Sequence, residues 1–177
     1  TNTDELVNDI VYQVGALREF GRRHGIPLQH VKPHGALYME AAANEELSEH
    51  LVETLASISN NIILFCMGVS KTYEVAKRSG LPVVREFYAD RDYDDNGSIV
   101  FKRQVGRPNP NLIAEKCVKA CREGKVKTVD GNDIKIEFES ICFHSDTPGA
   151  LEIGKNIRAG LIEAGVTIAP AAIVIGQ

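Results

Sequence analysis

Amphipathic helical segments alternate with short apolar strand segments along this chain. In the first helical segment, residues 4–24, apolar side chains recur every three or four positions: Leu6, Ile10, Val14, Leu17 and Phe20. The uninterrupted apolar run over residues 61–66 favours a strand that is buried on both faces. Helices that alternate with such strands through short connections are typical of parallel α/β units. The pattern therefore predicts an α/β fold.

The same reasoning places the other elements. It predicts strands over 28–33, 82–87, 140–144 and 166–175, helices over 44–59, 69–79, 110–123 and 148–165, and a hairpin of 126–129 with 134–138. Glycines 25, 80, 124 and 165 are expected to end four of the helices. Thr3 is expected to cap the first helix, and Pro148 to occupy the first position of the last one.

Composition excludes several functional classes. The 177 residues predict a single domain, 1–177. With 20 basic and 24 acidic residues the net charge is −4, which gives no electrostatic footprint for nucleic acid or an anionic membrane. The chain has four cysteines and lacks an apolar stretch of membrane-spanning length and a signal-peptide pattern, so a cytoplasmic location is expected. Cys117 and Cys121 are four residues apart, but no matching His/Cys pair lies nearby to complete a metal site.

Polar side chains cluster where three of the predicted strands end. They are Lys32 and His34, then Glu86, Asp90 and Arg91, then His144, Asp146 and Thr147. In parallel α/β folds, chemistry takes place just beyond the carboxyl ends of the strands. The polar stretch 88–110 is also unusually long for a loop without function. The sequence therefore predicts that these side chains converge in a hydrolytic site.

Each cluster also has a purely structural interpretation, and the sequence alone leaves both open. These interpretations are surface residues on a turn for Lys32 and His34, an exposed ion pair for Asp90 and Arg91, a helix N-cap for Asp146 and Thr147, and a core histidine for His144. An exposed ion pair would contribute less than about 1 kcal/mol to stability.

Three segments together resemble the signatures of the LamB/YcsF family. They read VKPHGALY at 31–38, REFYADRDYDDNGSIV at 85–100 and CFHSDTPGA at 142–150. The resemblance covers nearly the whole chain in the family's order. Where the family usually has H-G-D-T-P-G, Ser145 replaces the first glycine. The resemblance implies a seven-stranded (β/α) barrel of the glycoside hydrolase/deacetylase type.

Members of this family are longer at the N-terminus. They begin with a strand that carries D-L-N-x-D-x-G-E, followed by C-G-x-H-A-G-D and G-A-H-P, and none of these motifs occurs here. We therefore expect this chain to be a fragment or a processed form, the C-terminal two thirds of the barrel with the N-terminal strands missing. The absence of an initiator Met fits this expectation.

The resemblance implies ATP-dependent hydrolysis of 5-oxoproline to L-glutamate. The chain would be the A subunit of a 5-oxoprolinase and would work with the B and C subunits, with a homo-oligomer left open. A five-membered lactam re-closes readily because its amine and carboxylate stay close together, so ring opening needs coupling to ATP. The sequence has no Walker motif, and ATP is therefore expected on a partner protein. The need for a divalent metal is left open.

The resemblance and the strand-end positions together suggest roles for the polar residues. The predicted catalytic residues are Asp90 or Asp146 as the base for water, Lys32 and His34 as oxyanion donors, and His144 as the acid for the leaving nitrogen. The predicted substrate-binding residues are Gly35, Tyr38, Glu86, Arg91 and Thr147, with Arg91 holding the substrate carboxylate.

Two alternatives belong to other functional classes. The fold analogy also suggests a metal-dependent deacetylase for a carbohydrate or amide, in which His34, His144 and a carboxylate would hold a divalent metal such as zinc. The absent strands suggest instead a non-catalytic fragment that binds partner proteins through its exposed sheet edge.

Overall fold

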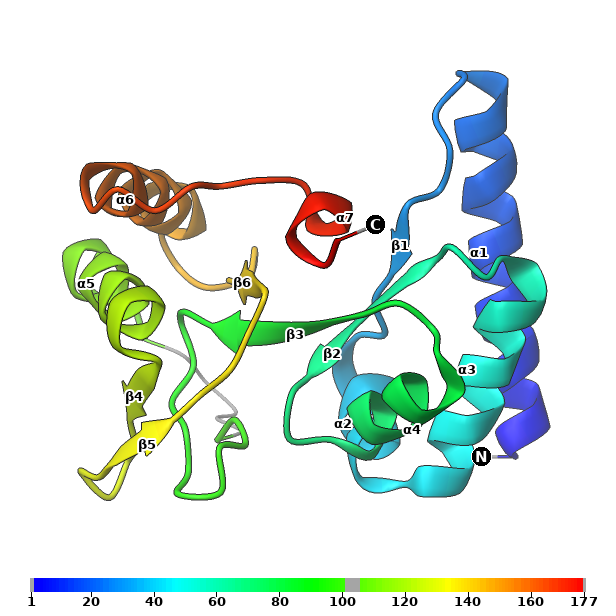
Figure 1. Ribbon diagram of the computed structural model, residues 1–177, viewed down its shortest axis with the longest axis horizontal. Helices are drawn as coiled ribbons and strands as arrows, with labels where there is room; N and C mark the ends of the chain where they lie inside the picture. Colours follow the sequence, from blue (N-terminus) through cyan, green and yellow to red (C-terminus); the bar gives the residue numbers. More distant parts are fainter. Residues whose placement is uncertain (1, 101–105, 177) are drawn as a thin grey trace. The chain divides into compact units, whose positions relative to one another are not determined.

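The computed structural model describes residues 2–100 and 106–176, which form two compact units (Figure 1). Unit 1 is Thr1–Arg85 and unit 2 is Glu86–Gln177. Residues 101–105 of the predicted functional loop lie outside the described residues. The single domain predicted from length stays a prediction, because compactness does not decide whether each unit folds alone. No helix within the described ranges combines the length and the apolar character needed to cross a bilayer.

Unit 1 alternates helices with parallel strands, as the sequence predicts. Its elements are α1 (Thr3–Arg23), β1 (His30–Val31), α2 (Gly35–Ala43), α3 (Glu45–Ile58), β2 (Ile63–Met67), α4 (Lys71–Ser79) and the start of β3 (Val83–Tyr88). β1 pairs with β2 in parallel, with Val31 opposite Leu64. On the other side of β2, the Leu64 N–H donates to the Pro82 carbonyl at 2.8 Å.

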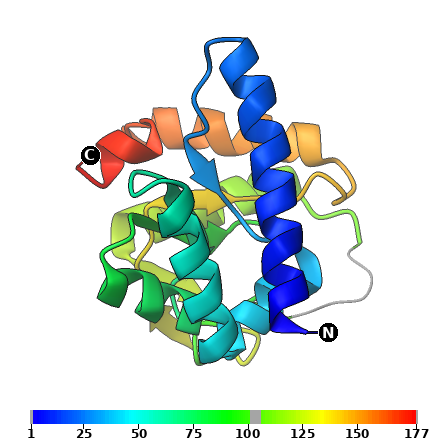
Figure 2. The ribbon, with the colours of Figure 1, turned by 90° about the vertical axis from the view of Figure 1, so that its right-hand side faces the viewer.

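The core of unit 1 is built around α3, which packs beside α1 (Figure 2). Leu47, Leu51 and Leu55 recur every four residues on one face of α3 and are at most 2% exposed. Ile10 and Val14 of α1 join the same apolar cluster. Burying a leucine side chain fully contributes about 1.5–3 kcal/mol. The apolar side chains that recur at helical spacing in the sequence are therefore the ones that pack together in the core of this unit.

Ser70 caps the N-terminus of α4, and its loss should destabilise the chain. The buried hydroxyl accepts from the Tyr73 N–H at 3.1 Å and donates to the Met67 carbonyl at 2.5 Å. Ser70→Ala is expected to lower the free energy of unfolding by about 1–2 kcal/mol, measured by urea denaturation. Ser57, exposed on α3 and bonded to the Thr54 carbonyl, offers the control Ser57→Ala, with a change within about 0.5 kcal/mol. Equal midpoints for the two variants would contradict this role.

The described part of unit 2 contains the end of β3 and six further elements. These are α5 (Pro110–Glu123), β4 (Lys125–Lys127), β5 (Asp133–Lys135), β6 (Ser140–Cys142), α6 (Ala150–Glu163) and α7 (Ala171–Val174). β3 pairs with β6 in parallel, with Tyr88 opposite Cys142. β4 and β5 form the predicted antiparallel hairpin, with Val126 opposite Ile134. The predicted α5 has the bounds the sequence suggested, and Gly124 ends it with φ +62°.

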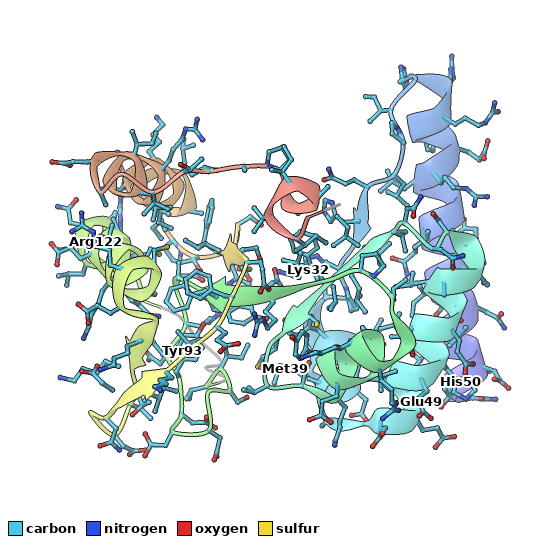
Figure 3. The ribbon with its side chains drawn as sticks, in the orientation of Figure 1. Lys32, Met39, Glu49, His50, Tyr93 and Arg122 are labelled. Atoms are coloured by element: carbon cyan, nitrogen blue, oxygen red, sulfur yellow. The ribbon has the colours of Figure 1, made fainter. Side chains whose placement is uncertain are left out.

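Helices α5 and α6 lie side by side in unit 2 (Figure 1). The two helices approach closely at Gly160, where an added Cβ would be in ordinary van der Waals contact with the Cβ of Ala114 at 3.5 Å. Cys117 of α5 and Ile153 of α6 are fully buried. Arg122, labelled in Figure 3, extends from α5 and donates to the Ala164 carbonyl at the end of α6 at 3.1 Å. The helix pair is thus fixed by packing along its length and by a hydrogen bond at one end.

The expected strand over 166–175 is wrong. Residues 166–170 are irregular, and Ala171–Val174 form the short helix α7. Pro170 has no N–H to donate to a sheet, and its fixed φ suits the residue before a helix. The apolar composition of the tail was therefore a poor guide to its structure. The helix α2 was not predicted, although its GALYMEAAA segment has the composition of a good helix former.

Two predicted helix starts are also wrong. α1 is capped by Asn2, whose side chain accepts from the Asp4 N–H at 3.0 Å, rather than by Thr3. α6 begins at Ala150 after Gly149, so Pro148 is not its first residue. The structural interpretation of Asp146 and Thr147 as the N-cap of this helix is wrong for the same reason. The Thr147 hydroxyl has different partners, described below.

Candidate functional site

The parallel register of unit 2 brings together two predicted catalytic residues. Tyr88 lies opposite Cys142, and the Ala89 N–H continues the ladder by donating to the Cys142 carbonyl at 2.8 Å. Asp90 follows β3 and His144 follows β6, each two residues beyond that pair. The two side chains therefore meet at the carboxyl ends of adjacent strands, where the sequence analysis placed the chemistry.

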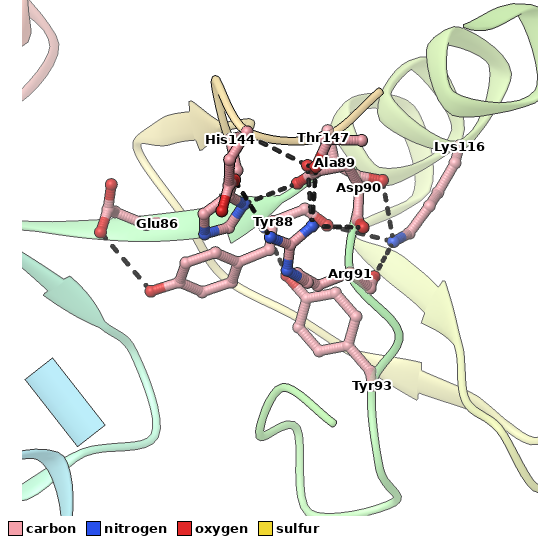
Figure 4. A network of polar contacts seen from close by, with 10 residues as sticks. Glu86, Tyr88, Ala89, Asp90, Arg91, Tyr93, Lys116, His144 and Thr147 are labelled. Atoms are coloured by element: carbon pink, nitrogen blue, oxygen red, sulfur yellow. Dashed lines mark hydrogen bonds and ion pairs between the residues drawn. The ribbon is translucent and has the colours of Figure 1, made fainter. Parts of the chain in front are cut away.

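The Asp90 carboxylate is the centre of a polar network (Figure 4). Its side chain is 0% exposed. Oδ1 lies 2.9 Å from Nδ1 of His144. Oδ2 accepts from the His144 main-chain N–H at 3.1 Å and from the Thr147 hydroxyl at 2.5 Å, and Nη1 of Arg91 lies 2.9 Å away. The predicted residues Asp90, Arg91, His144 and Thr147 are thus brought into direct contact.

These hydrogen bonds keep Asp90 ionised. Burial by itself would raise the pKa of Asp90, but the His144 ring, the Thr147 hydroxyl and the His144 N–H outweigh it and lower the pKa below its ordinary value. An ionised carboxylate only accepts hydrogen bonds, so Nδ1 of His144 must carry the proton in this contact. Nε2 is then the nitrogen that can take up a proton, and the His144 side chain is 32% exposed.

The lowered pKa of Asp90 predicts a loss of stability in acid. A carboxylate whose folded pKa lies below its unfolded value stabilises the fold above the unfolded pKa, about 3.9, and loses that contribution as pH falls toward the folded value. We expect the free energy of unfolding, measured in urea at pH 7 and pH 3, to fall more for the natural chain than for Asp90→Asn. An equal fall in both would contradict a paired Asp90.

Arg91 is committed mainly to the interior of this network. Nη1 donates to the Asp90 carboxylate, to the Asp90 carbonyl at 3.1 Å and to the Thr147 hydroxyl at 3.1 Å. Nη2 lies 3.9 Å from the Asp146 carboxylate, whose side chain is 86% exposed. The Asp90–Arg91 contact is therefore a buried pair rather than the exposed one that the structural interpretation assumed. The Nη2 side of Arg91 is the side directed toward a solvated group.

Two tyrosines that the sequence analysis did not select line the same network. The Tyr88 ring lies 6.4 Å from the His144 ring at 23°, and its hydroxyl donates to the buried Glu86 carboxylate at 3.5 Å. The Tyr93 hydroxyl accepts from the Tyr88 N–H at 2.6 Å. Burial raises the pKa of both tyrosines, so both remain neutral hydroxyls. Glu86, a predicted substrate-binding residue, is thus close to the network through Tyr88.

Lys116 of α5 also belongs to the site and was missed. Its Nζ donates to the carbonyls of Tyr88 at 3.1 Å, Ala89 at 3.2 Å and Arg91 at 2.5 Å (Figure 4). One signal could have found it. Lys116 is three residues after Ile113 and four before Ala120, so it shares the apolar face of the predicted helix. A lysine on such a face needs buried acceptors for its charge.

The remaining predicted residues lie in unit 1, just after β1. The Lys32 Nζ, labelled in Figure 3, lies 5.8 Å from the centroid of the Tyr38 ring, which is 8% exposed. His34 is the exposed residue preceding α2, and Gly35 begins α2 with φ +56°. The structure therefore pairs Lys32 with Tyr38. The convergence of these residues with the Asp90 network stays a prediction.

Residues 2–100 and 106–176 contain no group of three or more His, Cys, Asp or Glu side chains that could hold a metal ion. Burial raises the pKa of Cys117 to about 12 and also raises that of Cys121, so both are thiols near neutral pH.

Comparison with known proteins decides the family. The model of the LamB/YcsF family matches residues 1–176. This chain belongs to the LamB/YcsF family. A solved protein of similar structure is the lactam utilization protein from Thermus thermophilus, with a TM-score of 0.87 and 30% sequence identity over 95% of this chain and 68% of that one. The α/β fold with parallel strands is thereby confirmed.

Two curated LamB/YcsF relatives come from Pseudomonas. The protein named as the 5-oxoprolinase A subunit, number 1, in Pseudomonas aeruginosa is 56% identical over 164 residues, which are 93% of this chain and 65% of the relative. Its namesake in Pseudomonas putida is 52% identical over 167 residues, 94% of this chain and 66% of the relative. The chain thus spans slightly less than two thirds of the length of these relatives.

Proposed function

We propose that this chain provides the Asp90–His144 half of the A subunit of a 5-oxoprolinase, a hydrolase that opens the cyclic amide of 5-oxoproline to give L-glutamate. The observation that carries the proposal is the 56% identity to the Pseudomonas aeruginosa protein of that name. The Asp90–His144 pair supports it, because amide hydrolysis needs a group that can move a proton.

The proposal includes an architecture and partners. The parallel strands belong to a seven-stranded (β/α) barrel of the glycoside hydrolase/deacetylase type, whose other strands correspond to the part of the relatives that this chain does not match. The B and C subunits are the partners, since the relatives are named as one component of the enzyme. A homo-oligomer and a cytoplasmic location complete the proposal.

His144 is the group that moves the proton in this mechanism. Nε2 takes a proton from water as the water oxygen bonds to the lactam carbonyl carbon. It then returns the proton to the ring nitrogen as the C–N bond breaks, which leaves the carboxylate and amine of glutamate. Asp90 is a poor base because its carboxylate is enclosed and its pKa is lowered. Its role here is to hold Nδ1–H of His144 and favour the imidazolium that forms.

The remaining polar residues bind and polarise the substrate. Lys32 and His34 are proposed as donors to the carbonyl oxygen where negative charge develops. The Nη2 side of Arg91, which faces the solvated Asp146, would hold the substrate carboxylate. Gly35, Tyr38, Glu86 and Thr147 are proposed as further substrate-binding residues. Asp146 is the alternative base, since its carboxylate is 86% exposed and can reach water.

ATP is proposed to act through the partner proteins. The sequence has no Walker motif, and the described network presents carboxylate, imidazole and one guanidinium rather than a glycine-rich phosphate loop. ATP hydrolysis on a partner protein would supply the free energy that offsets re-closure of the lactam. The residues of this chain then bind the ring and transfer the proton.

The test is glutamate release from 5-oxoproline by this chain together with the B and C subunits of Pseudomonas aeruginosa, with and without ATP. We expect ATP-dependent glutamate, and its loss in His144→Ala. A positive control replaces this chain with the full-length relative. If only the full-length relative supports turnover, the chain is the non-catalytic partner-binding fragment considered above. Deacetylation of an N-acetylated sugar by metal-loaded chain, without ATP or the B and C subunits, would instead support the deacetylase alternative.

A further inference from the structure

Four consecutive main-chain carbonyls at the end of β3 and just beyond it are directed at cations. Those of Tyr88, Ala89 and Arg91 accept from Nζ of Lys116, and that of Asp90 accepts from Nη1 of Arg91. The Lys116 ammonium and the Arg91 guanidinium thus bind the main-chain carbonyls of residues 88–91. These hydrogen bonds hold the conformation of the backbone that carries the Asp90 carboxylate.

The three carbonyls around Lys116 form a cage that requires a cation. Their oxygens all lie within 3.2 Å of one point, so the negative ends of three peptide dipoles face each other. A protonated lysine has three N–H donors and no acceptor, which matches three converging acceptors. Without the ammonium, three partly buried carbonyls would lose their hydrogen bonds and repel one another. The segment would then relax to a different conformation.

Two aromatic rings also lie close to the Lys116 ammonium. Nζ of Lys116 lies 5.0 Å from the centroid of the Tyr93 ring and 5.2 Å from that of Phe87. The two rings stack at 5.6 Å and 17°. Their faces attract the ammonium and fix its direction. The Tyr93 hydroxyl also accepts the Tyr88 N–H, so the same ring holds both the cation and the segment that the cation binds.

We propose that Lys116 is a positioning residue of the active site, whose ammonium fixes the Tyr88–Arg91 backbone and so aligns the Asp90 carboxylate with His144. This inference rests on the proposed function and adds a residue to it. Lys116 binds the main-chain carbonyls before and after Asp90 and not the Asp90 carboxylate itself. It therefore influences His144 only indirectly, through the position of Asp90.

The charges around Lys116 set the pH range of this role. Burial lowers the pKa of Lys116 to about 8, against the opposing effects of Cys117 on α5 and of Asp92 and Asp90 on the neighbouring segment. Arg91 is the other cation on that segment, and Cys117 on α5 stays a thiol. The ammonium that fills the cage is therefore lost progressively as pH rises through about 8. Arginine at this position would keep its charge throughout.

The experiment compares Lys116→Ala, Lys116→Met and Lys116→Arg in the assembled enzyme. Lys116→Ala and Lys116→Met should lower kcat by about 10²-fold with little change in KM, as expected for a displaced catalytic group. n-Propylammonium chloride should restore Lys116→Ala, because it replaces the deleted atoms. It should not raise the kcat of Lys116→Met, because the methionine side chain fills the space that n-propylammonium would occupy. Lys116→Arg should keep partial activity and lose the decline in rate above pH 8.

A second readout does not depend on the reaction. The Nδ1 proton of His144 bonded to Asp90 should give a low-field proton NMR signal in the natural chain. We expect the signal to disappear in Lys116→Met and in Lys116→Ala, and to return in Lys116→Ala with n-propylammonium. If the enzyme shows no 5-oxoproline hydrolysis, this signal still tests Lys116, and the failure then belongs to the proposed function alone.

The control is Lys119→Met on the same helix, since Lys119 is 41% exposed and pairs with Asp133. It should change neither readout. An unchanged His144 signal in Lys116→Met overturns the proposal, as does equal rescue of Lys116→Ala and Lys116→Met by n-propylammonium. If Lys116→Ala does not fold, the His144 signal of Lys116→Met and Lys116→Arg decides, with loss in the first and retention in the second as the supporting result.

Discussion

Asp90→Asn should lower kcat for 5-oxoproline hydrolysis by about 10³–10⁴-fold, the loss expected when a catalytic histidine is held in the wrong tautomer. The carboxylate accepts from Nδ1 of His144 at 2.9 Å. An asparagine amide can instead donate to Nδ1, which leaves the proton on Nε2 and removes the base. KM should change little, because the Asp90 side chain is fully enclosed and does not contact substrate.

Glutamate release at saturating 5-oxoproline and ATP measures this effect. A matched control is Asp133→Asn, which removes an exposed carboxylate of β5 that pairs with Lys119 outside the Asp90 network. Its kcat should equal that of the natural chain. Urea denaturation of Asp90→Asn at pH 7 separates a fold defect from a catalytic one, and a folded variant with low kcat supports the tautomer argument.

Asp146→Asn decides between the two carboxylates. If Asp90→Asn remains active while Asp146→Asn is inactive, then the exposed Asp146 is the base and the enclosed Asp90 is structural. If Asp90→Asn is inactive and Asp146→Asn retains most of its activity, His144 is the proton carrier. The burial difference, 0% against 86% exposed, is the physical reason to expect the second result.

Local signals in the sequence predicted most helices well. The helix Pro110–Glu123 was predicted with its bounds, because Pro at its start and Gly124 at its end act on their own few residues. The tail over 166–175 failed because its apolar composition suits either a strand or a short helix, and Pro170 decides between them. The helix over residues 35–43 was not predicted, although its alanines favour a helix.

In the candidate site, too, some residues could be predicted from the sequence and others could not. Asp90 and His144 were predicted because both follow apolar strands, and parallel pairing brings strand ends together. Lys116 could not be placed in the same way. Its partners are main-chain carbonyls 25 to 28 residues earlier in the chain, and carbonyls leave no trace in a sequence. Only its position on an apolar helix face indicated an unusual environment.

Phe87→Ala should lower the free energy of unfolding by about 3–5 kcal/mol, a large share of the about 5–15 kcal/mol typical of a domain. Phe87 is 0% exposed and lies in β3 opposite Ile141. Its ring stacks on Tyr93 at 5.6 Å and lies 5.0 Å from Phe138. Alanine leaves a cavity beside the Tyr93 and Phe138 rings.

Urea denaturation followed by far-ultraviolet circular dichroism measures the loss. The control is Leu151→Ala, because Leu151 is 73% exposed on α6 and should change the free energy by less than about 0.5 kcal/mol. Similar midpoints for Phe87→Ala and Leu151→Ala would show that the ring does not support the fold of unit 2.

Phe87→Leu separates two roles of the Phe87 ring, which are packing in the core and orienting the Lys116 ammonium. Leucine restores much of the apolar volume, so the variant should regain most of the stability lost in Phe87→Ala. It does not restore the aromatic face 5.2 Å from the Lys116 ammonium. If the low-field His144 signal stays weak in a stable Phe87→Leu chain, the ring orients Lys116 as well as filling the core. If stability and signal return together, Phe87 acts through packing alone, and the carbonyl cage with Tyr93 suffices to hold the ammonium.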